Sequence, residues 1–194
     1  MSRKWALSQK IKKLIQKNNL CGVCIVDTSA IISDPKFYTT LPKSNYLVLI
    51  LKDVIAEIDE KKNYSGKPKF DSAFDEIRSW IDKGELLSKG ISIAGHLMLY
   101  VENNDNMKKF SSFFASKVDA KVLTLAKKLK KQINDVKILG ADNLIQIVSH
   151  LNKIDYFFIK SRDYDIKSED EKTITDTNNI DLVGQGQQDS KRNK

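Results

Sequence analysis

Long apolar runs are missing from this sequence, and cysteine and histidine are scarce. No run approaches the roughly 18 apolar residues that a bilayer-spanning helix needs. Residues 1–20 are basic and lack the continuous apolar segment of a signal peptide, so we expect a cytoplasmic protein with no membrane association. The 194 residues, 41% of them hydrophobic and 30% charged, suffice for one well-packed soluble domain.

The scarcity of cysteine and histidine argues against a zinc or redox centre. Cys21 and Cys24 form a C-x-x-C pair, but zinc needs two further ligands, and the two histidines, His96 and His150, are scattered. A redox pair opens a helix after a strand, whereas this pair leads into a predicted strand. We expect both cysteines to be small residues at the entrance of a strand, and His96 to be structural.

Positive charge is in excess and unevenly spread. The formal net charge is +8; residues 1–20 carry six Lys/Arg and no acid, whereas residues 168–194 carry four basic and six acidic residues. Such an excess is expected of a protein that meets polyanions, although a basic surface kept for solubility gives the same count.

The two ends of the sequence have different patterns. The spacing of apolar residues predicts an amphipathic helix at residues 5–17 that docks on the body or meets a partner. Residues 166–194 lack apolar periodicity and are predicted to be a disordered tail.

Strand and helix patterns alternate between these two ends. Apolar runs predict buried strands at residues 23–26, 46–51, 91–101, 136–139 and 156–159. Helical spacing predicts helices at residues 52–62, 70–82, 118–131 and 144–151. The alternation predicts an α/β fold, a three-layer α/β/α sandwich with a central, mostly parallel sheet.

Two loops and one helix face complete this prediction. Residues 63–69 are expected to be a flexible basic loop, and residues 102–117 a short helix or a lid. Trp80 is expected to flank the buried face of the helix at residues 70–82. The centre of that face is predicted to be Phe70, Phe74, Ile77 and Ile81.

Four acidic residues stand where predicted strands end or helices begin. Asp27 and Asp142 each follow a strand, whereas Glu57 and Asp119 lie early in a helix. Asp27 alone is equally explained as a helix cap, and Asp119 alone as a capping or first-turn acid. Glu57, beside the apolar stripe of its helix, needs a partner or a metal. Strand ends and the following helix starts share one edge of a parallel sheet, so the four are predicted to converge in one pocket.

Converging carboxylates have a physical consequence. They repel one another and raise one another's pKa unless a cation balances them. Hard oxygen ligands suit Mg²⁺ or Mn²⁺, which retain waters and bind substrate phosphate. A basic protein with an acidic, metal-loaded pocket is the expected layout for cleaving a phosphodiester.

Four segments resemble the PIN-domain nuclease family, in the family's order and spacing. They are Val26–Ile32, Val54–Asp59, Val118–Ala126 and Gly140–Asn143. Within the family, Ile32–Pro35 and Glu57–Lys62 make the chain most similar to the N-terminal PIN domain of PhoH-type proteins, and PIN domains linked to a TRAM module are similar too. The resemblance covers about residues 21–160 and identifies residues 21–165 as a PIN-like nuclease domain.

The resemblance implies a Mg²⁺- or Mn²⁺-dependent ribonuclease that cuts single-stranded RNA with a metal-activated water, leaving 5′-phosphate and 3′-hydroxyl ends. The ligands of one or two metals, direct or through water, would be Asp27, Glu57, Asp119 and Asp142. Their supporting residues would be Thr28, Ser29 and Asn143. The basic residues expected to meet RNA are Lys61, Lys62, Lys67 and Lys121.

Departures from the family pattern keep a second function open. Ser29 stands where the family has Asn, Leu51 replaces a proline, and Leu144 and Gln146 replace Asn and Arg. The alternative is a catalytically weak PIN-fold module that binds RNA or a protein. Haloacid-dehalogenase-type phosphatases are disfavoured because they need Asp at the position of Ser29, and receiver domains because they need an acidic pair at the first strand.

The resemblance also bears on partners. Members of the family pair as homodimers, act as toxins held by an antitoxin, or serve in RNA processing, and the sequence does not choose among these. No G-x-x-x-x-G-K-[ST] motif occurs, so the ATPase half of PhoH-type proteins is absent from this sequence.

Overall fold

The computed structural model describes residues 3–41, 45–65, 67–83, 89–102, 110, 114 and 116–161. All of them belong to one compact unit, residues 1–162. The tail predicted at residues 166–194 and most of the segment at 102–117 lie outside the described residues. No helix in the described part of the chain is long and apolar enough to cross a membrane.

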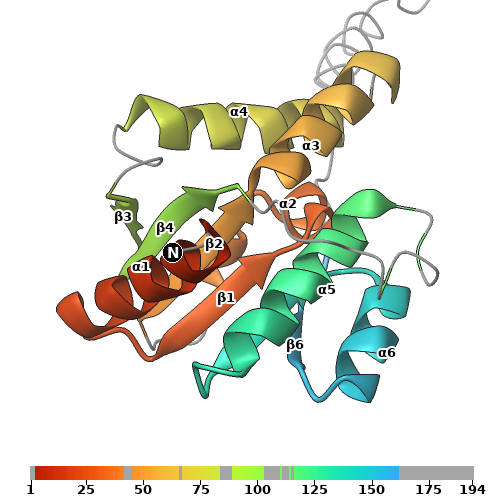
Figure 1. Ribbon diagram of the computed structural model, residues 1–194. Helices are drawn as coiled ribbons and strands as arrows, with labels where there is room; N and C mark the ends of the chain where they lie inside the picture. Colours follow the sequence, from red (N-terminus) through yellow and green to blue (C-terminus); the bar gives the residue numbers. More distant parts are fainter. Residues whose placement is uncertain are drawn as a thin grey trace, which may run out of the picture. The chain divides into compact units, whose positions relative to one another are not determined.

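A six-stranded sheet forms the centre of this unit (Figure 1). Its strands are β1 (Gly22–Val26), β2 (Tyr46–Leu51), β3 (Ile91–Ile93), β4 (His96–Val101), β5 (Val136–Gly140) and β6 (Asp155–Phe158). Their order is β3-β4-β2-β1-β5-β6, and only the β3–β4 pair is antiparallel. The predicted α/β fold with a mostly parallel sheet is confirmed.

Helices cover both faces of the sheet. They are α1 (Arg3–Lys17), α2 (Thr28–Ser33), α3 (Lys52–Ser65), α4 (Pro68–Asp82), α5 (Lys117–Lys130) and α6 (Asn143–Leu151), with a 3-10 turn at Phe37–Thr39. The connections through α2, α3 and α4 step along the sheet in one direction, and those through α5 and α6 step in the other. Because parallel crossovers are right-handed, the two groups lie on opposite faces.

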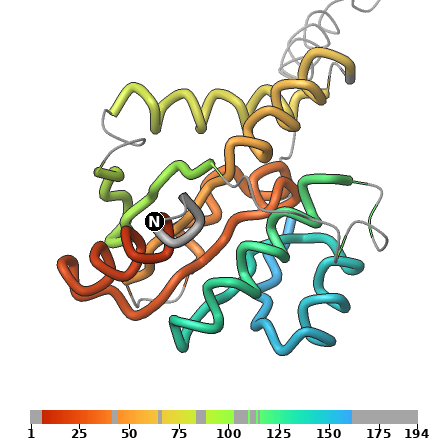
Figure 2. Tube along the Cα trace, in the orientation of Figure 1, coloured from red at the N-terminus to blue at the C-terminus, as the bar shows by residue number. Residues whose placement is uncertain are grey.

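The central strands are apolar along their whole length because both of their faces are covered. Every residue of β1 and β2 is buried, whereas β6, at the sheet edge, is partly exposed. The N-terminal helix α1 lies in front of the sheet on the side of α5 (Figures 1 and 2). Its Ile11 is fully buried, and Leu14 and Ile15 pack against the core, so the prediction of a docked amphipathic helix is confirmed.

The single strand predicted at residues 91–101 is wrong. The chain forms a β3–β4 hairpin that turns at Ala94 and Gly95, which have φ angles of 49° and 83°. Only glycine adopts this region without steric cost, and Ala-Gly lacks the Asn-Gly or Asp-Gly signal of a two-residue turn. His96, the first residue of β4, is buried, and its Nδ1 accepts a hydrogen bond from the Tyr46 N–H at 3.2 Å. His96 is therefore structural, as predicted.

The flexible loop predicted at residues 63–69 is also wrong. Helix α3 continues to Ser65, and α4 begins at Pro68. Proline is favoured at the first position of a helix because its missing N–H has no partner there. Pro68 therefore marks the start of a helix rather than a long loop.

The buried face of α4 differs from the predicted one. Ile81 is 54% exposed, whereas Trp80 is fully buried and its Nε1–H donates to Glu76 Oε1 at 2.9 Å. The buried residues of the helix are Phe70, Ala73, Ile77 and Trp80. Residues 80 and 81 are both apolar and fit neighbouring helical registers, so only the packing of the indole decides between them.

The two cysteines are free thiols. Cys21 is exposed just before β1, but Cys24 lies in the middle of that strand and not at its entrance. Burial raises the pKa of the Cys24 thiol to about 12, which leaves it uncharged and unreactive.

Candidate functional site

A pocket lies where the connections of the sheet change direction. β1 has β2 on one side and β5 on the other, so a crevice opens at the carboxyl ends of β1 and β5. In Figure 1, α2 and the first turns of α3 and α5 come together near this end of the sheet. The pocket has a volume of about 360 Å³. Its lining includes all four predicted acids, Asp27, Glu57, Asp119 and Asp142.

Asp27 lies at the base of the pocket, directly after β1. Its backbone N–H donates to Leu139 O at 2.8 Å, and its Oδ2 accepts from both Ser29 N at 3.1 Å and Ser29 Oγ at 2.5 Å. Its Oδ1 is buried and has no hydrogen-bond partner in the described part of the chain. Burial raises the pKa of Asp27, the bonds from Ser29 oppose this rise, and the nearby charge of Glu57 adds to it.

Glu57 projects from the second turn of α3 and is held by two partners. Thr28 Oγ1 donates to Glu57 Oε2 at 2.6 Å, and Lys61 Nζ lies 2.8 Å from Glu57 Oε1. Lys61 therefore balances one negative charge of the pocket. The two hydroxyls that follow Asp27 therefore have different partners. Ser29 Oγ donates to Asp27, and Thr28 Oγ1 donates to Glu57.

Asp119 lies in the first turn of α5, which Ser116 caps by accepting from Val118 N at 3.1 Å. The pKa of the Asp119 carboxyl is raised to about 7. Burial is the largest cause, followed by the charges of Asp27, Glu57 and Asp142, which Lys61 partly offsets. The three other acids of the pocket are thus close enough to Asp119 to disfavour its charged form.

Asp142 caps α6 and is the most exposed of the four acids. Its Oδ1 accepts from Leu144 N at 2.7 Å and Ile145 N at 3.1 Å. The Tyr156 hydroxyl accepts from Asp142 N and donates to Asp142 O, both at 3.1 Å. Ser29 Oγ also accepts from Ala141 N at 2.8 Å, which ties this loop to the start of α2.

Gly140 leaves the space that this arrangement needs. A Cβ at position 140 would lie 2.3 Å from the Tyr156 hydroxyl oxygen and 3.3 Å from Ser29 Oγ. Any side chain here would therefore push Tyr156 away from the loop that carries Asp142.

The other predicted residues divide between the pocket and its surroundings. Asn143 is exposed at the start of α6 and is not part of the pocket lining. Among the predicted RNA-binding lysines, only Lys61 lines the pocket. Lys62 pairs with Asp71 at 3.7 Å, Lys67 is exposed before α4, and Lys121 forms an ion pair with Asp53.

Sequence reasoning missed several residues of the site. Lys69, Phe70 and Ser116 line the pocket, and Tyr156 fixes the Asp142 loop. Lys69 belongs to the segment that the sequence predicts to be a flexible basic loop. That prediction includes the positive charge of Lys69 but does not place this side chain in the pocket. The contact of Tyr156 depends on the pairing of β5 with β6, which places Tyr156 opposite Ile138, and no sequence pattern specifies that register.

The donor set of the pocket fits a hard divalent cation. A buried carboxylate oxygen without a partner, Oδ1 of Asp27, costs free energy unless a donor or a cation reaches it. Within the described residues, no group of three or more His, Cys, Asp or Glu side chains is arranged to hold a metal ion. Carboxylate oxygens are hard ligands, which suit Mg²⁺, an ion that keeps several waters and uses one or two carboxylates directly.

The family is established by sequence. The PIN domain family matches residues 24–160, and this chain belongs to it. PIN domains are generally nucleases, so the chain has the fold of a nuclease family. No curated protein matches the sequence.

The solved structures that match this chain include the following one. It is described as a domain of a functionally unknown protein from Methanocaldococcus jannaschii DSM 2661. It is 16% identical, with a TM-score of 0.48, and the match covers 84% of this chain and 99% of that one.

Proposed function

We propose that this protein is a metal-dependent endoribonuclease that hydrolyses single-stranded RNA. The observation that carries the proposal is the pocket at the switch point of the sheet, where four carboxylates meet and one buried oxygen of Asp27 lacks a partner. Membership of a nuclease family agrees with it. The excess of basic residues suits a polyanionic substrate.

Asp27, Glu57, Asp119 and Asp142 are the residues that would hold Mg²⁺ or Mn²⁺, directly or through water. When bound, such an ion activates water and neutralises charge on the phosphate. Ser29 keeps the Asp27 carboxylate in one orientation, and the same restraint on Glu57 comes from Thr28. The roles of these residues are part of the proposal.

Two lysines of the chain act on the substrate itself. Lys61 and Lys69 line the pocket and bring positive charge to a scissile phosphate. Asp119, whose pKa is about 7 in the fold without metal, would be held in its charged form by a bound ion. The expected products carry 5′-phosphate and 3′-hydroxyl ends.

A catalytically weak binding module is the second candidate. The observation that favours it is the ion pair between Lys61 and Glu57, because it uses one carboxylate that the metal would need.

We also propose that the chain lies beside the PhoH-type and TRAM-linked PIN domains within the family. The segments Ile32–Pro35 and Glu57–Lys62 support this placement.

One assay separates the two functions. The full chain is incubated with end-labelled single-stranded RNA in Mg²⁺, in Mn²⁺ and in EDTA, and the product ends are mapped. Cleavage with either metal that stops in EDTA, and products with 5′-phosphates, are expected. Binding of RNA without turnover in Mn²⁺ would favour the binding module, and cleavage that persists in EDTA would contradict the proposed site.

A further inference from the structure

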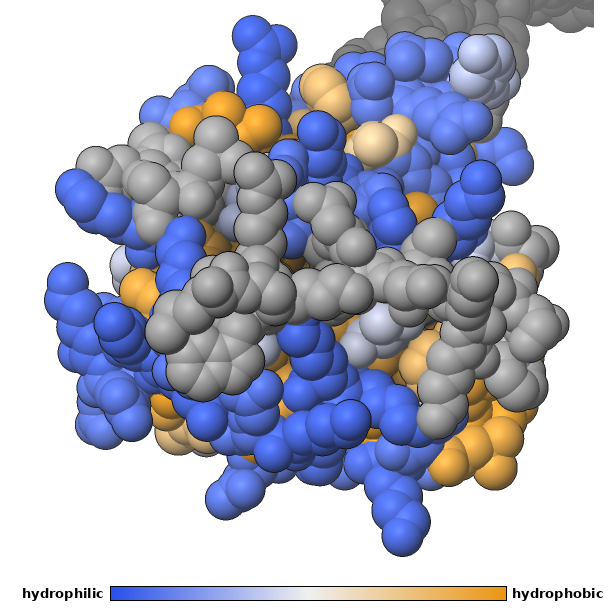
Figure 3. All heavy atoms as spheres, viewed as in Figure 1, coloured by the Kyte–Doolittle hydropathy of each residue, from blue (hydrophilic) through white to orange (hydrophobic). Residues whose placement is uncertain are grey.

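The helices on the two faces of the sheet carry opposite charge. On one face, α1 has six Lys/Arg and no acid, and α5 has five and one. On the other face, α3 has three Lys/Arg and four acids, and α4 has two and four. The basic excess of the folded part therefore gathers on the α1 and α5 side. Figure 3 shows hydrophilic side chains over this side of the molecule.

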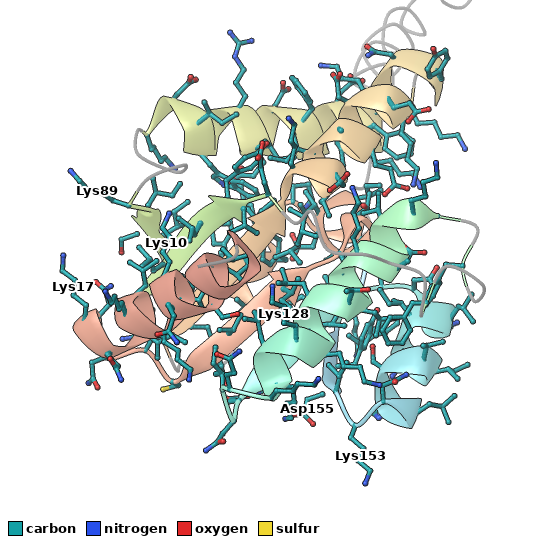
Figure 4. The ribbon with its side chains drawn as sticks, in the orientation of Figure 1. Lys10, Lys17, Lys89, Lys128, Lys153 and Asp155 are labelled. Atoms are coloured by element: carbon teal, nitrogen blue, oxygen red, sulfur yellow. The ribbon has the colours of Figure 1, made fainter. Side chains whose placement is uncertain are left out.

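Helix α1 is the most one-sided element of the described chain. Lys10, Lys13 and Lys17 are exposed, and their spacing of three and four residues puts them on one face of the helix. They rim a shallow hollow of about 380 Å³, together with Gln9 and Leu14. Figure 4 shows Lys10 and Lys17 on this helix and Lys128 on α5.

The charges of α1 are unfavourable for the helix itself. Like charges three and four residues apart repel each other and destabilise a helix. The first turn has no acid, although the helix dipole favours one there. Lys10, Lys13 and Lys17 form no ion pair with any described acid. A bound polyanion would relieve this repulsion.

The helix also lies outside the part of the chain that the family accounts for. The family match begins at residue 24, whereas α1 ends at Lys17. The pocket that holds the four acids has no α1 residue in its lining. The basic helix is therefore a feature of this chain in addition to the catalytic fold.

We propose that α1, through Lys10, Lys13 and Lys17, binds the phosphate backbone of an RNA strand at a surface separate from the pocket. The three side chains extend over about 10 Å, at a rise of 1.5 Å per residue. Phosphate contacts of this kind position a strand without reading its sequence. The choice of RNA as the polyanion rests on the proposed nuclease function. The surface raises affinity for long strands and leaves the chemistry in the pocket unchanged.

The test is a binding measurement that does not depend on cleavage. Fluorescence anisotropy follows the full chain with a single-stranded RNA of about 30 nucleotides, in EDTA, between about 0.05 and 0.2 M salt. Lys13→Gln/Lys17→Gln is compared with Arg78→Gln/Lys83→Gln, which removes two exposed charges from α4 on the other face. The α1 pair should lose about tenfold or more in affinity at low salt, and its salt slope should fall by about 1.4, because two phosphate contacts of a single strand are lost.

Two results of these measurements would overturn the proposal. Equal losses in the two double variants would mean that net charge, and not α1, governs binding. Tighter binding to vesicles of anionic phospholipid than to RNA, lost in the α1 variant, would assign the helix to a membrane surface. Cleavage of an oligonucleotide of about four nucleotides in Mn²⁺ should be the same in both variants, and absence of cleavage by the wild-type chain would count against the nuclease proposal alone.

Discussion

The two ends of the central strands hold polar clusters of opposite character. At the amino ends, Lys137 Nζ donates to Tyr46 OH at 2.8 Å and to Asp135 Oδ1 at 2.5 Å, and the Tyr46 hydroxyl donates to Asp135 Oδ2 at 3.0 Å. At the carboxyl ends, four acids face one pocket, and Lys61 is the cation that pairs with one of them.

The difference shows in the ionisation of the groups. At the amino ends, burial lowers the pKa of Lys137, but the hydrogen bonds to Asp135 and Tyr46 and the charges of these two groups together raise it by more, so the charged form of the lysine is favoured. At the carboxyl ends, burial and like charges raise the pKa of Asp27 and Asp119, so their charged forms are disfavoured. A cluster with satisfied groups holds the strands together, whereas a cluster with unsatisfied groups is available for a ligand.

The largest expected effect is on catalysis, at the carboxyl ends. Asp27→Asn should lower RNA cleavage on the order of a thousandfold or more, because it removes a proposed metal ligand. The melting temperature should not fall, since the change removes a buried charge that repels its neighbours. Cleavage rates and thermal melts of the purified variant measure both quantities.

A matched control is available seven residues further along the chain. Asp34 is also fully buried, but it caps α2 outside the pocket and accepts from Lys36 N at 3.0 Å. Asp34→Asn should leave the cleavage rate per folded molecule unchanged. Equal loss in both variants, or full activity in Asp27→Asn with contaminating nuclease excluded, would contradict the site.

The second effect is on stability, at the amino ends. Lys137→Met should lower the free energy of unfolding by about 1–3 kcal/mol, because Asp135 and Tyr46 lose a charged hydrogen-bond partner. Denaturant unfolding measures the loss, and the exposed Lys131→Met is the control, with an expected change below about 0.5 kcal/mol. A cleavage defect in folded Lys137→Met would break the separation between the two clusters.

The sequence specified the carboxyl-end cluster better than the amino-end one. Asp27 and Asp142 follow apolar strands, and the rule that parallel strands end at one edge was enough to bring them together. Tyr46, Asp135 and Lys137 meet from two strands that are not neighbours in the sheet, around the start of β1 between them. No local pattern marks such a contact, because it depends on the order and register of strands.

The same limit applies to the surroundings of Lys121. The resemblance implies that Lys121 meets RNA, and its place on the outer side of a helix agrees with this. Its partner Asp53 lies 68 residues away in the sequence, so the ion pair was not foreseeable from α5 alone. Conversely, the helix at residues 118–131 was well predicted, because its burial repeats with the helical period.

The third effect combines metal and pH. In the fold without metal, Asp119 has a pKa of about 7 against an ordinary 3.8, so between these values the folded state binds a proton that the unfolded state does not. The unfolding free energy should therefore fall as pH rises through this window. A divalent ion favours the charged carboxylate, so Mn²⁺ should raise the melting temperature by a few degrees at pH 8 and less at pH 5.5. Thermal melts at both pH values, with and without Mn²⁺, measure this shift. If Mn²⁺ raised the melting temperature of Asp27→Asn as much as that of the wild-type chain, the proposed site would be contradicted.

The smallest effect is at the support of the fourth acid. Tyr156→Phe removes the hydroxyl that bonds both backbone groups of Asp142. Cleavage should fall about tenfold, with a loss of about 1 kcal/mol in unfolding free energy. Tyr100→Phe, on β4, is the matched control and should leave cleavage unchanged. An unaltered rate in folded Tyr156→Phe would show that the Asp142 loop keeps its position without the hydroxyl.

The bare backbone at Gly140 has a consequence for protein engineering. The position has no room for a side chain, since even one methyl group would collide with the Tyr156 oxygen. A substitution at residue 140 would therefore displace the Tyr156 side chain unless residue 156 changes with it. A smaller residue at position 156 would leave space for a side chain at position 140. Paired changes at these two positions are then the natural way to alter the position of the Asp142 carboxylate.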